Sequence, residues 1–458
     1  MPQIDAVLEQ ADRDLGNALE RLFGLLRRKS ISTDPAFADD CARAADWLVE
    51  DLASIGFAAS RRDTPGHPMV VAHGEGSGPH ALFYGHYDVQ PVDPPELWTR
   101  PPFEPAIEDT AAGKVIRGRG AADDKGQLMT FVEACRAWKT VTGALPIRVS
   151  VLFEGEEESG SPSLVPFLQA NGEELKADIA LVCDTGMWNA ETPAITTMLR
   201  GMVAEEVTIK AAEKDLHSGM YGGLAINPIR VLARIIAGLH DDTGRITLPG
   251  FYDGVTEVPG EVKAQWDTLG FDHRAFLGGI GLSEPAGEAG RPALEQIWAR
   301  PTCDVNGIRG GYTGAGFKTV LPAQAAAKVS FRLVGDQDPD AITRAFRDYV
   351  SACLPPDCSV SYTTKNSSRA TVMPIDRPEF DKARQALSEE WPNRAVYIGC
   401  GGSIPVVGHF RDILGMDSVL IGFGLDDDSI HSPNEKYNLE SFRKGIRSWI
   451  RVLGALSA

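Results

Sequence analysis

Five short segments of the chain carry side chains that could do chemistry. They are residues 85–88 (G-H-Y-D), 118–126 (G-R-G-A-A-D-D-K-G), 154–161 (E-G-E-E-E-S-G-S), 183–184 (C-D) and 430–435 (I-H-S-P-N-E). Each segment supplies His, Asp or Glu, the residue types that bind divalent metals or transfer protons. Taken singly, each also has an ordinary explanation as a surface loop, a helix cap or a solvated acidic turn.

The spacing of His86 and Asp88 suits a metal site. In extended chain, residues i and i+2 point the same way, so the Asp88 carboxylate can reach the His86 ring. A carboxylate that accepts one ring proton fixes the tautomer of the histidine and leaves its other nitrogen for a metal.

The glycines before Asp123 could suggest a dinucleotide-binding loop. Asp123 stands where the third glycine of that motif is needed, and an acid there would repel a pyrophosphate. At this predicted start of a helix, Asp124 is expected to cap the helix. For Asp123, capping competes with metal binding.

Glu156, Glu157 and Glu158 are three consecutive carboxylates in a turn flanked by glycine and serine. Their like charges repel one another, and a divalent cation would remove that repulsion. Adjacent glutamates in a turn can face different ways, so one can bind a metal while its neighbour stays free.

The surrounding patterns predict an α/β domain. Apolar runs indicate buried strands over 69–72, 81–84, 147–153, 179–183 and 418–423, and helical patterns cover 126–139, 164–169 and 439–453. Strands that alternate with helices favour a mixed sheet covered by helices on both faces. Each chemistry-bearing segment lies just beyond a predicted strand, at the sheet edge where ligands bind. Two histidines and several carboxylates converging there form the composition of a two-metal hydrolase site.

The middle of the chain predicts a second, inserted domain. Strands are expected over 205–210, 303–308, 328–334 and 359–363, and helices over 228–239 and 341–352. This β-α-β-β-α-β order is the split βαβ, or ferredoxin-like, arrangement of an α+β domain. We therefore expect a discontinuous first domain of residues 1–200 and 373–458, interrupted by residues 201–372. Residues 247–300 are expected to form loops and short helices.

Composition excludes several classes of protein. The 458 residues include 63 acids and 45 bases, a net charge of −18, so the chain has no general attraction for nucleic acid or anionic lipid. The 7 cysteines form no C-x-x-C pair and are expected to be reduced, packed thiols. No signal peptide and no apolar run as long as a membrane span is apparent, which favours a cytoplasmic location.

Together with D-L-H-S-G at residues 215–219, the five segments resemble the M20 metallopeptidase family, in the same order and over nearly the whole chain. The resemblance is strongest to its cytosolic dipeptidase branch, which includes carnosine and Cys-Gly dipeptidases. Residues 215–223 (D-L-H-S-G-M-Y-G-G) are especially similar to that branch.

The resemblance implies two divalent metal ions in each subunit. One metal is expected on His86, Asp123 and Asp184. The other is expected on Glu158, His431 and again Asp123, which bridges the pair. Zinc suits these mixed ligands best, and manganese or cobalt also suits them. The family often has a cis peptide after the bridging aspartate.

The resemblance also assigns catalytic roles. Glu157 is expected to be the general base and Asp88 the residue that orients His86. A water shared by the two metals becomes the nucleophile because its pKa falls toward neutrality. Glu157 then accepts its proton and passes it to the leaving amine.

The inserted domain is expected to serve as a lid and as the contact surface of a homodimer. His217 is expected to stabilise the carbonyl oxyanion from the neighbouring subunit. Arg332 matches the branch's carboxylate-binding arginine, since a guanidinium binds a carboxylate bidentately. Ser403 matches a further substrate contact.

The predicted function is hydrolysis of dipeptides that have free amino and carboxyl ends. Asp184 supports it, because family members that act on acyl groups usually have glutamate at that position. The alternative is an N-acyl-amino-acid amidohydrolase that uses the same metals. A third possibility, a metal-binding scaffold without activity, conflicts with the presence of Glu157 and all five ligands.

Overall fold

The structure, a computed structural model, describes residues 2–458 and divides into two compact units. The first unit contains the chain up to Thr197 together with 373–398 and 409–458, and the second contains 198–372 and 399–408. The chain leaves the first unit within β8 (Ala194–Leu199) and re-enters it after β15 (Thr371–Val372). The sequence had assigned 399–408 to the first domain, whereas here this segment groups with the second unit.

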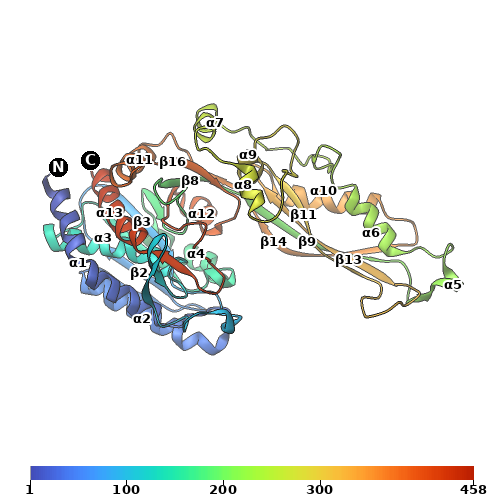
Figure 1. The fold of residues 1–458 in the computed structure, drawn as a ribbon, viewed down its shortest axis with the longest axis horizontal. Helices are drawn as coiled ribbons and strands as arrows, with labels where there is room; N and C mark the ends of the chain where they lie inside the picture. Colours follow the sequence, from blue (N-terminus) through green and yellow to red (C-terminus); the bar gives the residue numbers. More distant parts are fainter. Residues whose placement is uncertain (1) are drawn as a thin grey trace. The chain divides into compact units, whose positions relative to one another are not determined.

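A mixed sheet forms the centre of the first unit (Figure 1). In spatial order its strands are β1 (Ala58–Arg62), β2 (Met69–Gly74), β6 (Arg148–Glu154), β3 (His80–His86), β7 (Ile179–Val182), β17 (Ser418–Ile421), β8 and β15, and β16 (Val396–Cys400) also pairs with β8. β3 is parallel to both of its neighbours, while β1, β2 and β8 run antiparallel to theirs. The predicted mixed α/β sheet is confirmed.

The central strands are buried on both faces, so they read as continuous apolar runs in the sequence. Neighbouring residues of β3 show this, since they point to opposite faces. Phe83 stacks on Phe131 at 3.7 Å between ring centroids. Tyr84 packs on the other side against Phe410, with ring centroids 5.7 Å apart.

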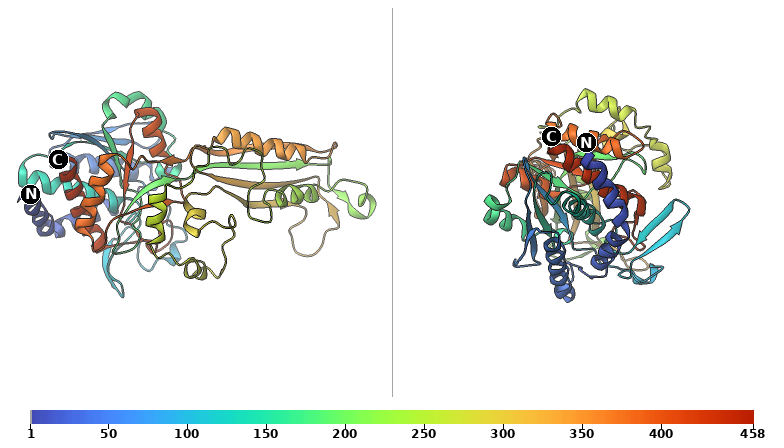
Figure 2. Two further views of the ribbon diagram at one scale, coloured as in Figure 1. Left: turned by 90° about the horizontal axis from the view of Figure 1, so that it is seen from above. Right: turned by 90° about the vertical axis from the view of Figure 1, so that its left-hand side faces the viewer.

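Helices cover both faces of this sheet. They are α1 (Pro2–Leu26), α2 (Ala38–Ser54), α3 (Lys125–Thr142), α4 (Leu164–Leu175), α11 (Pro378–Glu390) and α13 (Leu439–Leu456). α13 packs beside α3 and α11, and α1 packs against both α3 and α13 (Figure 2). α1 therefore buries its apolar residues against the other helices rather than against the sheet.

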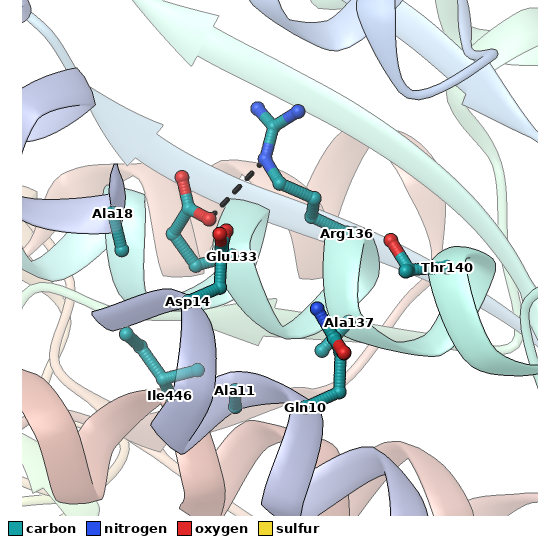
Figure 3. Close-up of a pocket in the computed structure, with 9 residues that line it drawn as sticks. All are labelled: Gln10, Ala11, Asp14, Ala18, Glu133, Arg136, Ala137, Thr140 and Ile446. Atoms are coloured by element: carbon teal, nitrogen blue, oxygen red, sulfur yellow. Dashed lines mark hydrogen bonds and ion pairs between the residues drawn. The ribbon is translucent and has the colours of Figure 1, made fainter. Parts of the chain in front are cut away.

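Ion pairs fix α1 and α2 to α3. Arg21 of α1 donates to both carboxylate oxygens of Glu133 at 2.6 Å. Arg136, one turn further along α3, reaches Glu133 at 3.2 Å and Asp51 of α2 at 2.7 Å. Figure 3 shows the pair of Glu133 and Arg136 beside small residues of α1 and α3.

The second unit has the predicted split βαβ order. Its sheet runs β11 (Thr302–Gly310), β13 (Gln324–Leu333), β9 (Gly201–Lys210) and β14 (Ser359–Ser368), all antiparallel. α6 (Pro228–Ala237) and α10 (Pro339–Ala352) share one apolar core with these strands and lie along the sheet (Figure 1). Alternate residues of β9 are buried, as expected for a strand covered on one face.

Smaller elements complete both units. The second unit adds β10 (Leu216–His217), β12 (Val320–Leu321), α5 (Ser218–Tyr221), α7 (Gly260–Asp267), α8 (His273–Gly278) and α9 (Ala293–Trp298). Residues 247–300 thus form loops and short helices, as predicted. The first unit adds a three-stranded sheet that the sequence did not predict, made of β4 (Ala106–Thr110), β5 (Gly113–Arg117) and β18 (Lys436–Asn438). α12 (Pro405–His409) follows β16.

No helix within residues 2–458 is long and apolar enough to cross a membrane. The seven cysteines all lie within these residues; they form no disulfide, and four of them are buried.

We predict that the aromatic cluster over β3 determines the stability of the first unit. Phe131 is fully buried between Phe83 and Trp449. Phe131→Ala removes a whole ring and should lower the free energy of unfolding by about 3–5 kcal/mol in urea titrations. The control Val141→Ala, at an exposed position of the same helix, should change it by less than about 0.5 kcal/mol. Equal effects of the two substitutions would contradict the assignment.

Candidate metal centre

The sheet places the predicted ligands at neighbouring strand ends. β3 lies between β6 and β7 and is parallel to both, so the carboxyl ends of the three strands meet at one edge. His86 ends β3, and Asp184 follows β7 by two residues. Glu158 lies in the turn after β6. The sheet thus brings together side chains that are far apart in the sequence.

Two groups of potential ligands share Asp123. His86, Asp123 and Asp184 form one group, in which the ligand atoms lie within 4.8 Å of one another. Asp123, Glu158 and His431 form the second by the same measure. The two oxygens of Asp123 face different histidines: Oδ1 is 3.1 Å from His86 Nε2, and Oδ2 is 2.9 Å from His431 Nε2. The same two sets are those that the family resemblance implied.

Asp88 is fully buried and contacts both His86 and the acidic turn. Its Oδ1 lies 3.4 Å from His86 Nδ1, and its backbone oxygen lies 3.2 Å from the same nitrogen. Its carboxylate also accepts the backbone N–H groups of Glu157 at 3.2 Å and Glu158 at 3.0 Å. Ser32 Oγ donates a further bond, at 2.6 Å. Asp88 therefore fixes the His86 ring and the start of the turn together.

The three glutamates of the turn point in different directions. Glu156 is buried and accepts the backbone N–H groups of His67 at 2.9 Å and Ser163 at 3.0 Å, which closes the loop around it. Glu158 Oε2 lies 3.3 Å from His431 Nε2 and accepts a bond from Gln90. Glu157 forms no ion pair among residues 2–458 and remains available as a base.

The cluster carries more negative charge than its histidines can balance. Burial raises the pKa of Asp184 well above its usual value; the His86 charge opposes this shift, and the Asp123 charge adds to it. Burial likewise raises the pKa of Glu157, again against His86, with the Glu158 charge adding to the rise. Bonds to Asp123 and Glu158 raise the pKa of His431 to about 10.

These residues fit a pair of divalent metal ions. Imidazole nitrogens and carboxylate oxygens are suitable ligands, and Asp88 aims the second nitrogen of His86 at the cluster. Cations would replace the protons that now hold the histidines charged, and would offset the excess of acids. The two groups differ in access, since the His86 side chain is 1% exposed and the His431 side chain 55%.

Asp124 does not cap the following helix as predicted. It occupies the N-cap position of α3, but its side chain makes no capping bond. Instead, its Oδ2 accepts the backbone N–H of His86 at 3.1 Å. The inward turn of this buried side chain orders the end of β3. The Asp123–Asp124 peptide bond is cis, as the resemblance implied.

The loop that carries His431 has an unusual backbone. His431 has φ 57° and Asn434 has φ 64°, a left-handed conformation that few residues other than glycine adopt. The Asn434 side chain holds the loop by accepting the Thr99 N–H at 2.8 Å and donating to the Leu97 oxygen at 2.8 Å. Such strain persists where surrounding contacts determine the conformation, and it is common at functional sites.

Sequence reasoning missed three residues that support the ligands. Ser32 bonds Asp88, Gln90 bonds Glu158, and Glu435 accepts the Asp123 N–H at 3.1 Å. Only Glu435 gave a usable signal, because it is an acid in the same I-H-S-P-N-E segment as His431. Ser32 and Gln90 lie in stretches with no distinguishing pattern.

Arg332 and Ser403 meet within the second unit. Arg332 Nη1 donates to Ser403 Oγ at 3.1 Å, and Ser403 Oγ donates in turn to the backbone oxygen of Arg200. Arg332 forms no ion pair within residues 2–458, so its charge is available to an anion. His217, also in this unit, is exposed at the start of α5, where its Nδ1 accepts the Gly219 N–H at 3.0 Å.

Comparison with known proteins decides the family. Residues 82–455 match peptidase family M20/M25/M40. The chain belongs to this family. The match includes both groups of potential ligands and the whole second unit, so the resemblance inferred from the sequence motifs is confirmed.

Similar proteins cover most or nearly all of the chain. The chain is 28% identical over 472 residues to the Cys-Gly metallodipeptidase dug1 of Schizosaccharomyces pombe, covering 99% of this chain and 98% of that protein. It is 28% identical over 396 residues to the human Beta-Ala-His dipeptidase, covering 83% and 76%. The crystal structure of an M20 family metallo-carboxypeptidase, Sso-CP2 of Sulfolobus solfataricus, superposes with TM-score 0.84 at 29% identity over 96% of this chain and 99% of that one.

We predict that removing divalent metal destabilises the first unit. Two like charges 4 Å apart repel by about 4 kcal/mol at an effective dielectric near 20, and several carboxylates share this pocket. Chelation should lower the melting temperature by about 5 °C or more, measured by calorimetry, and added Zn²⁺ should restore it. An unchanged melting curve after verified metal removal would show that the carboxylates share no metal.

Proposed function

We propose that the protein is a metal-dependent dipeptidase, which hydrolyses the peptide bond of dipeptides with free amino and carboxyl ends. One observation carries the proposal: Asp123 joins two ligand groups beside an unpaired glutamate, in a chain of this peptidase family. The full-length similarity to a Cys-Gly metallodipeptidase and the partial similarity to a Beta-Ala-His dipeptidase support the substrate class.

The two groups would hold two divalent ions, one on His86, Asp123 and Asp184 and the other on Asp123, Glu158 and His431. Zinc is the proposed metal, with manganese or cobalt as alternatives. The bound pair supplies Lewis acidity toward a water molecule and toward the scissile carbonyl.

Glu157 is the proposed general base. Its carboxylate accepts a proton from the attacking water and returns it to the leaving amine nitrogen. The raised pKa of Glu157 supports this role, because a base works best when its pKa lies closer to the working pH. Asp88 supports it indirectly, by holding the backbone of the turn and the ring of His86.

Arg332 and Ser403 are proposed to bind the substrate's carboxylate. An unpaired guanidinium beside a hydroxyl offers several donors to two carboxylate oxygens. A site that binds the substrate's free carboxylate favours free dipeptides over longer or amidated peptides.

We further propose a homodimer in which the second unit forms the contact and His217 acts on the partner's substrate. Apolar exposure on that unit supports association: Leu224 is 88% exposed, and Ile308, on the edge strand β11, is 64% exposed. Exposed apolar patches and open sheet edges are common at interfaces between subunits.

Two related activities compete with this proposal. An N-acyl-amino-acid amidohydrolase would use the same metal site, although Asp184 argues against it. The second competing activity is that of a carboxypeptidase, which the likeness to Sso-CP2 supports. All three activities need the same metals, so the substrate's ends must distinguish them.

The deciding experiment offers one dipeptide with its amino end free or acetylated, with and without Zn²⁺ or Mn²⁺. A dipeptidase cleaves the free dipeptide and spares the acetylated one. Cleavage of the peptide bond in the acetylated substrate indicates a carboxypeptidase, and release of acetate indicates a deacylase. Elemental analysis of the purified protein identifies the metal.

We predict opposite effects for the two adjacent glutamates. Glu157→Gln should keep both metals and lower kcat about 100- to 10,000-fold, because a base is lost but no ligand is. Glu158→Gln should weaken the binding of one metal. Metal content and kcat measured on both variants check this. Metal loss in Glu157→Gln alone would reverse the two roles.

We predict that Arg332→Ala raises KM for free dipeptides by a large factor. Amidating the substrate's carboxyl end should impair the wild-type enzyme to a similar degree, since each change removes one side of the same ion pair. Arg309→Ala, an exposed arginine of the same unit, is the control and should keep wild-type KM. Equal turnover of free and amidated dipeptides would exclude Arg332 from this role.

We predict that His217 acts across the dimer. His217→Ala should lower the rate about 100- to 1000-fold if the residue stabilises the oxyanion. Mixing His217→Ala subunits with Glu157→Gln subunits creates heterodimers with one intact and one doubly damaged site. Each heterodimer should recover about half of the wild-type activity. No recovery, despite proven subunit exchange, would place His217 in its own chain's site or in none.

A further inference from the structure

Glu435 is a fully buried carboxylate with four hydrogen-bond donors around it. Its Oε1 accepts the backbone N–H groups of Ala122 at 2.9 Å and Asp123 at 3.1 Å. Its Oε2 accepts the Gly120 N–H at 2.9 Å and Arg119 Nη1 at 2.8 Å. All four donors come from one short stretch of chain, so a single side chain determines the path of that stretch.

That stretch ends at the residue shared by both ligand groups. The bond from Glu435 reaches the backbone of Asp123, whose two carboxylate oxygens face His86 and His431. A shift of the Asp123 backbone would move both oxygens together. Glu435 also follows His431 closely in the same segment, so it joins the Asp123 loop to the His431 loop, two of the three loops that supply the second group.

We infer that Glu435 is a positioning residue that sets the bridging geometry of Asp123. It does not face the ligand cluster as a ligand, because both of its oxygens are occupied by N–H donors of the Asp123 loop. Supporting residues of this kind typically change metal affinity about 10- to 100-fold when they are mutated.

Arg119 completes the arrangement from the far side. It is buried, donates from Nη2 to the Pro91 oxygen at 2.9 Å, and its guanidinium carbon lies 5.2 Å from the ring centre of Trp98. These contacts fix the guanidinium, and the guanidinium in turn fixes Glu435. A lysine could not form both hydrogen bonds in the same geometry.

The inference rests on the metal pair of the proposed function, and its test separates the two. A wild-type protein that binds no divalent metal would refute the proposed function. A wild-type protein that binds two metals, together with a Glu435 variant that binds them equally well, would refute only this inference.

The test compares Glu435→Gln with Glu133→Gln in Co²⁺ titrations of metal-free protein. The first substitution preserves the size of the side chain but leaves a single acceptor oxygen, and the new amide N–H₂ group would face N–H donors. Glu133 is a similarly buried carboxylate of the same unit that bonds Arg21 and Arg136 and belongs to neither group of potential ligands. Figure 3 shows its pair with Arg136. Both variants lose stability, but only a positioning residue alters the metal centre.

We expect Glu435→Gln to raise the Co²⁺ dissociation constants of both sites by about 10-fold or more and to change the visible spectrum of the bound Co²⁺. Glu133→Gln should keep both properties while its melting temperature falls. Dissociation constants within about twofold of wild type and an unchanged spectrum in Glu435→Gln would overturn the inference. If Glu435→Gln does not fold, Arg119→Lys decides. It should weaken both sites by about threefold or more, and wild-type affinity there would overturn the inference.

Discussion

Repulsion among carboxylates is the constraint on which the first unit's site depends. The structure meets it in two ways. Asp88 and Glu156, which are not candidate ligands, are held by backbone N–H groups, which stabilise a buried carboxylate without adding a full positive charge. Glu435 is held by backbone N–H groups together with Arg119. Asp123 pairs with both His86 and His431, whereas burial and the neighbouring charge of Asp123 raise the pKa of Asp184. Backbone dipoles therefore order the loops, while the carboxylates of the two groups of potential ligands face the two histidines.

Much of the fold, and the position of part of the candidate site, could be predicted from local sequence patterns. Buried parallel strands give continuous apolar runs, and the chain must turn at their carboxyl ends, so His86 and Asp184 could be placed at one edge from the ends of their strands alone. The fold of the second unit could be predicted equally well, since the alternation of buried residues in β9 and the amphipathic patterns of α6 and α10 reflect a sheet covered on one face. The ligand sets themselves came from family resemblance rather than from spacing.

The features that could not be predicted depend on contacts between distant parts of the chain, which no local sequence pattern records. Asp124 has the residue type and position of a helix cap, yet its side chain turns toward β3, where it accepts the buried backbone N–H of His86. The strand β4 is short and mostly polar, so it shows no alternation and is defined only by its pairing with β5. Glu435 finds its partners more than 300 positions earlier in the chain, a relationship that spacing cannot reveal.

The order of the potential ligands along the chain has a consequence for biosynthesis. His86, Asp123, Glu158 and Asp184 all precede the inserted unit, whereas His431 and Glu435 follow it. β17, the strand between β7 and β8, also comes after the insertion. A nascent chain emerging from the ribosome therefore completes the whole second unit while the first still lacks an inner strand, one imidazole and the carboxylate beneath Asp123. Until residues 418–435 are synthesised, the carboxylates of the acidic loops lack the imidazole of His431, and β17 is missing between β7 and β8. The sheet of the first unit is therefore completed only after translation has passed the insertion.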